Sequence, residues 1–194
     1  MKKKQQKKGG STAPYRWAVT VFLMAVALSA VLSLASESML DGAGVVVAVL
    51  ILAAFIGLGI VFDIIGVATT AADPKPFHSM AAHKEKGAKE ALYLLRNANK
   101  VSSVCNDVVG DICGVVSGSA SATIAAQILR DMDFGWPQLI TLLMSAFCAA
   151  LTVGGKAIGK SIAVNSCTEI VHTVGKIVFR FQNLMGGSGK KKRK

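Results

Sequence analysis

Three carboxylates lie inside otherwise apolar stretches of the chain: Asp63, Asp107 and Asp111. A charged side chain near the centre of a bilayer costs about 2.5 to 3.5 kcal/mol on insertion scales, so such residues usually face a cavity or a bundle interior. Asp107 and Asp111 are four residues apart and share a helix face, with Ser103 one turn earlier on the same stripe. Two carboxylates on adjacent turns repel each other. The pattern predicts a cation or proton site, and oxygen ligands favour hard cations such as Mg²⁺ or Na⁺.

Each of these acids also has a structural interpretation. Asp63 comes late in its apolar stretch, where its carboxylate can reach the headgroup region while its backbone stays in the apolar layer. Asp107 can lie at the membrane interface, which leaves only Asp111 deep, as a structural hydrogen-bond acceptor. The sequence alone leaves these interpretations open beside the ion site.

The elements that position these residues are apolar runs of membrane-spanning length. The chain has 194 residues, of which 52% are hydrophobic, and its mean hydropathy is +0.50. Runs of about 20 apolar residues are long enough to cross a bilayer. We therefore expect an all-α membrane protein, with four transmembrane helices near residues 17–35, 45–68, 101–129 and 137–153.

The basic residues give these helices an orientation. Of the 22 Lys and Arg residues, only Arg130 falls on the far side of the four apolar runs. The positive-inside rule then predicts a plasma-membrane protein with both termini and residues 73–100 in the cytoplasm. The formal net charge of +11 is a topology signal rather than a sign of nucleic-acid binding, because the basic residues flank apolar segments. We expect the basic termini to contact anionic lipid.

We therefore predict three regions in the chain: a basic cytoplasmic N-terminus (1–16), a transmembrane domain (17–160), and a juxtamembrane helix with a basic tail (161–194). An alternative for the first apolar run is a signal peptide, since a Lys-rich start precedes it and small residues end it. The run is longer than the usual apolar core of a signal peptide, which favours an uncleaved helix.

Two further helical segments are expected on the cytoplasmic side. The sequence Asp73-Pro74-Lys75-Pro76 ends the second span, and an amphipathic helix follows over residues 77–96. A C-terminal juxtamembrane arm, residues 154–185, alternates apolar and basic residues in the manner of an interfacial helix.

A ladder of small residues lies beside the acidic stripe of the third span. Its members are spaced by four: Asn106, Gly110, Gly114, Gly118 and Ala122. Small residues at this spacing let another helix approach closely within lipid. The ladder predicts a tight helix contact, either with another span or with a second subunit.

The sequence offers no support for an enzyme. It contains no nucleophile with a base, no zinc motif and no phosphate-binding loop. The four cysteines form no CxxC pair, and we interpret them as small packing residues.

Motifs over residues 60–180 resemble the CorB/CorC and cyclin-M (CNNM) magnesium transporters. The stretch KGAKEALYLLRN, residues 86–97, followed by Val101-Ser102-Ser103 and Asn106, is similar to that family's cytoplasmic loop and the following span. The stretch GKAIGKSIA, residues 155–163, resembles the family's GEIxPKxxA segment, with Lys156 in place of Glu and Gly159 in place of Pro. The regulatory CBS pair that usually follows in the family is not part of this sequence.

The resemblance implies a dimeric magnesium exporter that works by alternating access, with Mg²⁺ between the second and third spans and Na⁺ as the counter-ion. It adds Asn106 to the expected ligands, which are then Asp63, Ser103, Asn106, Asp107 and Asp111. The substituted motif leaves a second expectation open: a non-transporting membrane subunit or dimerisation partner that keeps the fold with a degenerate ion site.

Overall fold

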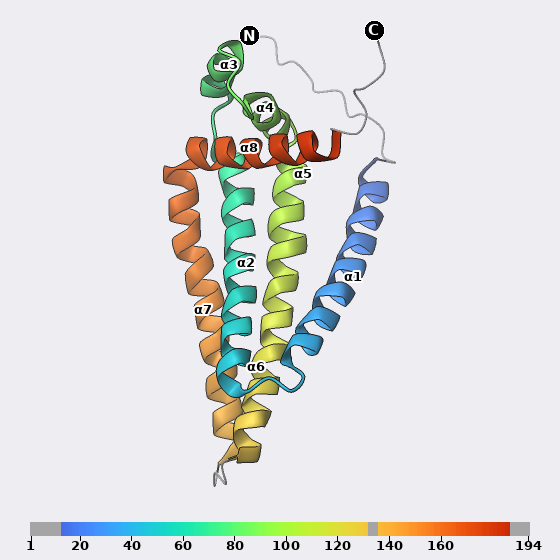
Figure 1. Cartoon of the computed structure of the whole chain (residues 1–194), viewed down its shortest axis with the longest axis vertical. Coiled ribbons are helices and arrows are strands. Elements are labelled where there is room, and N and C mark those ends of the chain that lie inside the picture. The colour runs from blue at the N-terminus through green and yellow to red at the C-terminus, as the bar shows by residue number, and fades with distance from the viewer. Residues whose placement is uncertain (1–12, 132–135, 187–194) are drawn as a thin grey trace, which may run out of the picture.

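The computed structural model describes residues 13–131 and 136–186, and all regular secondary structure in these ranges is helical. Four helices there are long and apolar enough to cross a membrane: Trp17–Leu40, Val45–Ala71, Ala98–Arg130 and Pro137–Asn165. The prediction of an all-α protein with four such helices is confirmed at this level. The helices form an elongated bundle that is crossed at one end by a transverse helix (Figure 1).

The first two spans are longer than predicted. Helix α1 runs Ala13–Leu40, so Glu37, expected in a loop, belongs to the helix. After Pro14 in its first turn, the chain has no Gly or Pro until Gly42, whose φ of 70° turns the chain toward α2. Helix α2 runs Val45–Ala71 and ends just before Asp73, whose side chain accepts a hydrogen bond from the Lys75 backbone N–H at 3.0 Å to start the next helix.

The third span is three consecutive segments rather than one regular helix. Helix α5 (Ala98–Ser102) leads into a π-helical segment, η1 (Ser103–Gly110), and then into α6 (Asp111–Asp131). The Asp111 backbone N–H donates to the Asn106 carbonyl, five residues back, as π-helical geometry requires. The sequence prediction of a plain helix over residues 101–129 missed this change, which falls in the segment that carries most of the candidate ligands.

Helix α7 runs Pro137–Asn165, 29 residues, and extends well beyond the predicted end at residue 153. In this extension Gly155 and Gly159 lie against the Ile60 and Ile64 side chains of α2, so α7 keeps packing on α2 past its predicted end. The juxtamembrane arm therefore does not begin at residue 154. It is α8, Cys167–Gly186, which crosses the ends of the spanning helices (Figure 1).

The expected single helix over residues 77–96 is wrong, because the structure has two: α3 (Pro74–Ala82) and α4 (Ala88–Arg96). Lys84 and Gly87 have positive φ angles, 58° and 86°, so the backbone turns between the helices. The break lets α4 pack along α8. Together, α3, α4 and α8 form what we call the α8 end of the bundle.

Three apolar clusters hold the bundle together. One joins α1, α2, α6 and α7 in the half far from α8, and a second joins α1, α2 and the third span near its middle. The third cluster, around Ala68, Phe77, Ala91, Ala163 and Val171, fixes α3, α4 and α8 to α2 and α7. Large apolar side chains such as Phe22, Leu142 and Phe147 remain exposed along the spans. Long helices with an apolar outer surface are typical of membrane-embedded proteins.

Candidate cation site

The centre of the candidate site is Asp63 on α2, which is only 5% exposed. Its neighbours on the same helix face are Gly59, four residues before, and Gly66, three after. A β-carbon on Gly59 would lie 3.5 Å from the Gly110 carbonyl oxygen, and one on Gly66 would overlap Asn106 Oδ1. The face of α2 that carries Asp63 therefore packs against the third span between Asn106 and Cys113.

Two oxygen acceptors in this region lack hydrogen-bond partners. Within the described part of the chain, neither Asp63 Oδ2 nor Asn106 Oδ1 accepts a hydrogen bond, although both atoms are buried. Asn106 Nδ2 donates to Ser102 Oγ at 3.4 Å, which turns the amide oxygen toward α2. A buried acceptor without a donor is costly. A proton on Asp63, or a cation shared by the two oxygens, would remove that cost.

The π-helical geometry of η1 helps to place Asn106. A π turn is wider than an α turn, and such segments occur frequently at functional sites. The close approach of η1 to α2 depends on Gly66, because any side chain at that position would push the Asn106 amide away. The sequence prediction singled out Asn106 by resemblance, but neither its partner Gly66 nor the π segment was recognised.

The other predicted ligands lie elsewhere on the third span. Ser103 Oγ donates to Asp107 Oδ2 at 2.9 Å, which confirms that these two residues share a stripe. Asp107 is exposed on the outside of the bundle. Asp111 is also exposed and pairs with Lys156 Nζ of α7 at 3.2 Å. The five predicted residues thus fall into an inner pair, Asp63 and Asn106, and an outer stripe.

Lys156 is a further candidate residue, and the sequence prediction did not include it. Its side chain is only 20% exposed, and its ammonium lies 3.5 Å from the position that a β-carbon on Gly110 would take. The ammonium therefore lies beside η1 and supplies positive charge next to the outer stripe. The sequence signal for Lys156 was its position in the GEIxPKxxA-like segment, where the resembling family has Glu.

The inner pair has the chemistry of a hard-cation site with few protein ligands. Among residues 13–131 and 136–186, no group of three or more His, Cys, Asp or Glu side chains gathers where it could hold a metal ion. A carboxylate and an amide oxygen are the ligand types that Mg²⁺ prefers, and Mg²⁺ commonly keeps several waters when it binds a protein through one or two carboxylates. The residues present therefore fit a partly hydrated ion better than a fully dehydrated one.

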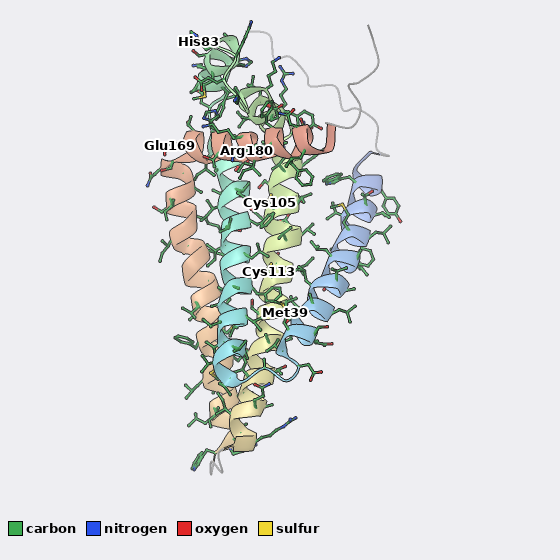
Figure 2. The ribbon with its side chains drawn as sticks, viewed as in Figure 1. Met39, His83, Cys105, Cys113, Glu169 and Arg180 are labelled. Atoms are coloured by element: carbon green, nitrogen blue, oxygen red, sulfur yellow. The ribbon has the colours of Figure 1, made fainter. Side chains whose placement is uncertain are left out.

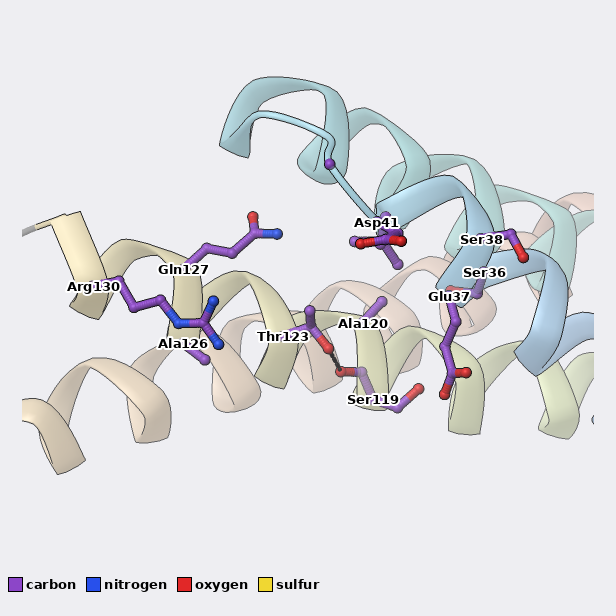
Figure 3. A pocket seen from close by; sticks show the side chains of 12 residues that line it. Ser36, Glu37, Ser38, Asp41, Ser119, Ala120, Thr123, Ala126, Gln127 and Arg130 are labelled. Carbon is purple, nitrogen blue, oxygen red and sulfur yellow. Dashed lines mark hydrogen bonds between the residues drawn. The ribbon is translucent and has the colours of Figure 1, made fainter.

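A second polar region lies at the end of the bundle opposite α8. A cavity of about 710 Å³ opens there between the end of α1 and α6. Figure 3 shows the Asp41 carboxylate facing the cavity from one side, with Gln127 and Arg130 on the other. Ser36, 3% exposed, also lines it. The buried Gln127 Oε1 accepts no hydrogen bond from the described residues. Its lining residues fall partly between the first two predicted spans and partly in the third, and the sequence did not predict the cavity.

Comparison with known proteins gave no match to a family model, to a curated protein or to a solved structure. The likeness to the magnesium transporters therefore rests on the motifs in residues 60–180 alone.

Proposed function

We propose that this protein transports a divalent cation across the membrane, with Mg²⁺ as the substrate and the Asp63–Asn106 pair as its binding site. The observation that carries this proposal is the burial of an unpaired carboxylate oxygen and an unpaired amide oxygen on facing spans. Intramembrane carboxylates that face a bundle interior commonly mark ion pathways. The oxygen-only chemistry of the pair favours Mg²⁺ over softer metals.

The two ends of the bundle suggest a route for the ion. The cavity at the end opposite α8 is lined by two acids, Glu37 and Asp41, and one base, Arg130, and its net negative charge would favour cations over anions. By the positive-inside rule this end faces the outside of the cell, and both termini lie in the cytoplasm. Alternating access would then connect Asp63 to each side in turn. Coupling to Na⁺, suggested by the family resemblance, is part of the proposal.

We further propose that the protein works as a homodimer in the plasma membrane. Within the described residues of the single chain, the outer half of the ladder has no partner: a β-carbon on Gly114 or Gly118 would meet nothing within 4 Å. The same side of the third span exposes Asp107 and Asp111, which would be unfavourable against lipid. A second copy placed here would cover both the small residues and the charges.

A second candidate function is favoured by Lys156. A lysine ammonium beside Asp111 can serve as a permanent internal cation, so that part of the predicted ligand set never binds an ion. The protein would then be a non-transporting subunit that keeps the fold. This alternative leaves the unpaired Asp63 and Asn106 oxygens without a role, so transport is preferred.

Flux measurements in proteoliposomes separate the two candidates. Vesicles with an internal Mg²⁺-sensitive dye should report Mg²⁺ entry with the wild-type protein and at least about tenfold less with Asp63→Asn. Glu169→Gln removes an exposed carboxylate at the start of α8 and serves as the charge-matched control, with flux unchanged. Wild-type flux equal to that of protein-free vesicles would favour the non-transporting subunit.

A further inference from the structure

The basic residues at the α8 end are not spread evenly over its surface. Lys86, from the turn before α4, and Lys176 and Arg180, from α8, line one cavity of about 340 Å³ together with Phe179. We call it the basic pocket. Lys176 and Arg180 are four residues apart, so they project from the same side of α8. Figure 2 marks Arg180 on α8, well separated from Glu169 at the start of that helix.

Two glycines bring these charges together. Gly87 has a φ of 86°, and a β-carbon on it would overlap the Lys176 backbone nitrogen. A β-carbon on Gly175 would overlap the Gly87 carbonyl oxygen. The backbones of the α4 start and of α8 are therefore in direct contact, which only glycine at both positions permits. Because Lys86 precedes Gly87 and Lys176 follows Gly175, this contact places the two lysines side by side.

The three cations have no acidic partner in the described part of the chain. Across residues 13–131 and 136–186, no carboxylate lies within ion-pair distance of Lys86, Lys176 or Arg180. Glu85, the acid next to Lys86, lies instead 3.8 Å from His172 Nε2. Three like charges around one cavity repel each other. A multiply bonded anion such as phosphate would relieve that repulsion and accept hydrogen bonds from all three side chains.

An apolar stripe on α8 borders the basic pocket. Ile177, Phe181 and Leu184 follow a helical spacing and are all exposed. Ile177 and Phe181 come directly after Lys176 and Arg180, so the apolar and basic stripes are adjacent along the helix. An interfacial helix places its apolar side in the acyl region and its basic side at the headgroups. A lipid whose chains cover this stripe would have its phosphate within reach of the pocket.

We propose that the basic pocket binds a phosphate group, and that its source is the headgroup of an anionic lipid. The site differs from the basic terminal segments, which lie outside the described residues, and it does not depend on the proposed transport function. The same chemistry would accept a soluble phosphate compound, so the test must separate the two sources.

The test uses the full-length protein in detergent, with lipid adducts counted by native mass spectrometry. The lipid probes are phosphatidylglycerol and the zwitterionic phosphatidylcholine. Inorganic phosphate is the third probe, and its binding is measured as a shift in thermal unfolding. The pocket variant is Lys86→Gln/Lys176→Gln/Arg180→Gln. The matched control is Lys75→Gln/Lys84→Gln/Lys89→Gln, which removes the same charge from exposed positions of α3, α4 and their connection.

Phosphatidylglycerol should bind the wild-type protein and the control variant equally well, and should bind the pocket variant about tenfold more weakly. Phosphatidylcholine should bind all three proteins weakly. If inorganic phosphate stabilises the protein through the pocket with the same affinity as phosphatidylglycerol, the phosphate site is supported but the lipid is overturned as its source. Equal losses in the two triple variants, or equal binding of both lipids, would overturn the proposal. If the pocket variant is not monodisperse, Arg180→Gln against Lys89→Gln gives the same comparison.

Discussion

Gly66 of α2 lies against the side-chain amide of Asn106 in η1, so closely that a β-carbon on Gly66 would overlap Asn106 Oδ1. This contact fixes the level at which the second and third spans meet. It also holds the amide oxygen on the side of η1 that faces Asp63, one turn earlier on α2. The glycine is therefore a positioning residue for the proposed ion site.

Gly66→Ala should displace the Asn106 amide and weaken Mg²⁺ binding by about tenfold while the protein remains folded. The end of the Asn106 side chain can rotate away, so the clash disturbs the site more than the bundle. Gly57→Ala, on the same helix, is the control, because a β-carbon at Gly57 would meet nothing within 4 Å. Thermal unfolding with and without Mg²⁺ reports both effects. Equal Mg²⁺ responses from the two variants would contradict a positioning role for Gly66.

The Lys156–Asp111 ion pair should show energetic coupling. Lys156→Gln leaves the Asp111 carboxylate without its partner within a spanning segment, and Asp111→Asn leaves the ammonium alone. Each single variant should be destabilised, whereas the double variant should recover part of the loss. We expect a coupling energy of about 0.5 to 3 kcal/mol, the range for residues in contact. Strictly additive effects in thermal or denaturant unfolding would mean that the pair contributes nothing.

The small-residue ladder should act between chains rather than within one. Gly114→Leu or Gly118→Leu adds a side chain where the single chain has open space, so the monomer should fold normally. Cross-linking in detergent should nevertheless show a loss of dimer, because the added leucine separates the two backbones. Gly154→Leu, at an exposed and equally open position on α7, should leave the dimer intact. Loss of folding in the Gly114 variant, or an unchanged dimer, would exclude this face as the interface.

Cysteine labelling tests the orientation of the bundle. In a Cys167→Ser background, Asp41→Cys should react with a membrane-impermeant thiol reagent in intact cells, and Lys89→Cys should react only after lysis. Both side chains are exposed, at opposite ends of the bundle. Position 87 is unsuitable for a probe because the positive φ and tight packing of Gly87 require glycine. The reverse labelling pattern would contradict the proposed orientation of the bundle.

The sequence predicted the spans well because apolar runs of this length have few alternatives to a membrane helix. It missed where they end. Past Gly154, α7 packs against Ile60 and Ile64 of α2, a contact between segments that lie far apart in the chain. The break between α3 and α4 was also missed. That turn is set by the backbone contact of Gly87 with α8, which no local pattern reveals.

The candidate site was predicted in part for a similar reason. Charge within an apolar run identified the three acids, and their spacing correctly placed Ser103 beside Asp107. Spacing along one helix cannot show which acids face another helix. Tertiary packing divides the one predicted cluster into two. Asp111 pairs with Lys156, 45 residues away in the chain, whereas Asp63 is buried separately.

Direct Mg²⁺ binding to the purified protein, measured by titration calorimetry at fixed ionic strength, is the sharpest test of the ion site. We expect saturable binding that Asp63→Asn abolishes or weakens by at least about a hundredfold. Asp111→Asn, which removes an exposed carboxylate already paired with Lys156, should weaken binding by no more than a few-fold. Unchanged binding in Asp63→Asn, or a greater loss in Asp111→Asn, would contradict the assignment of Asp63 as the ion ligand.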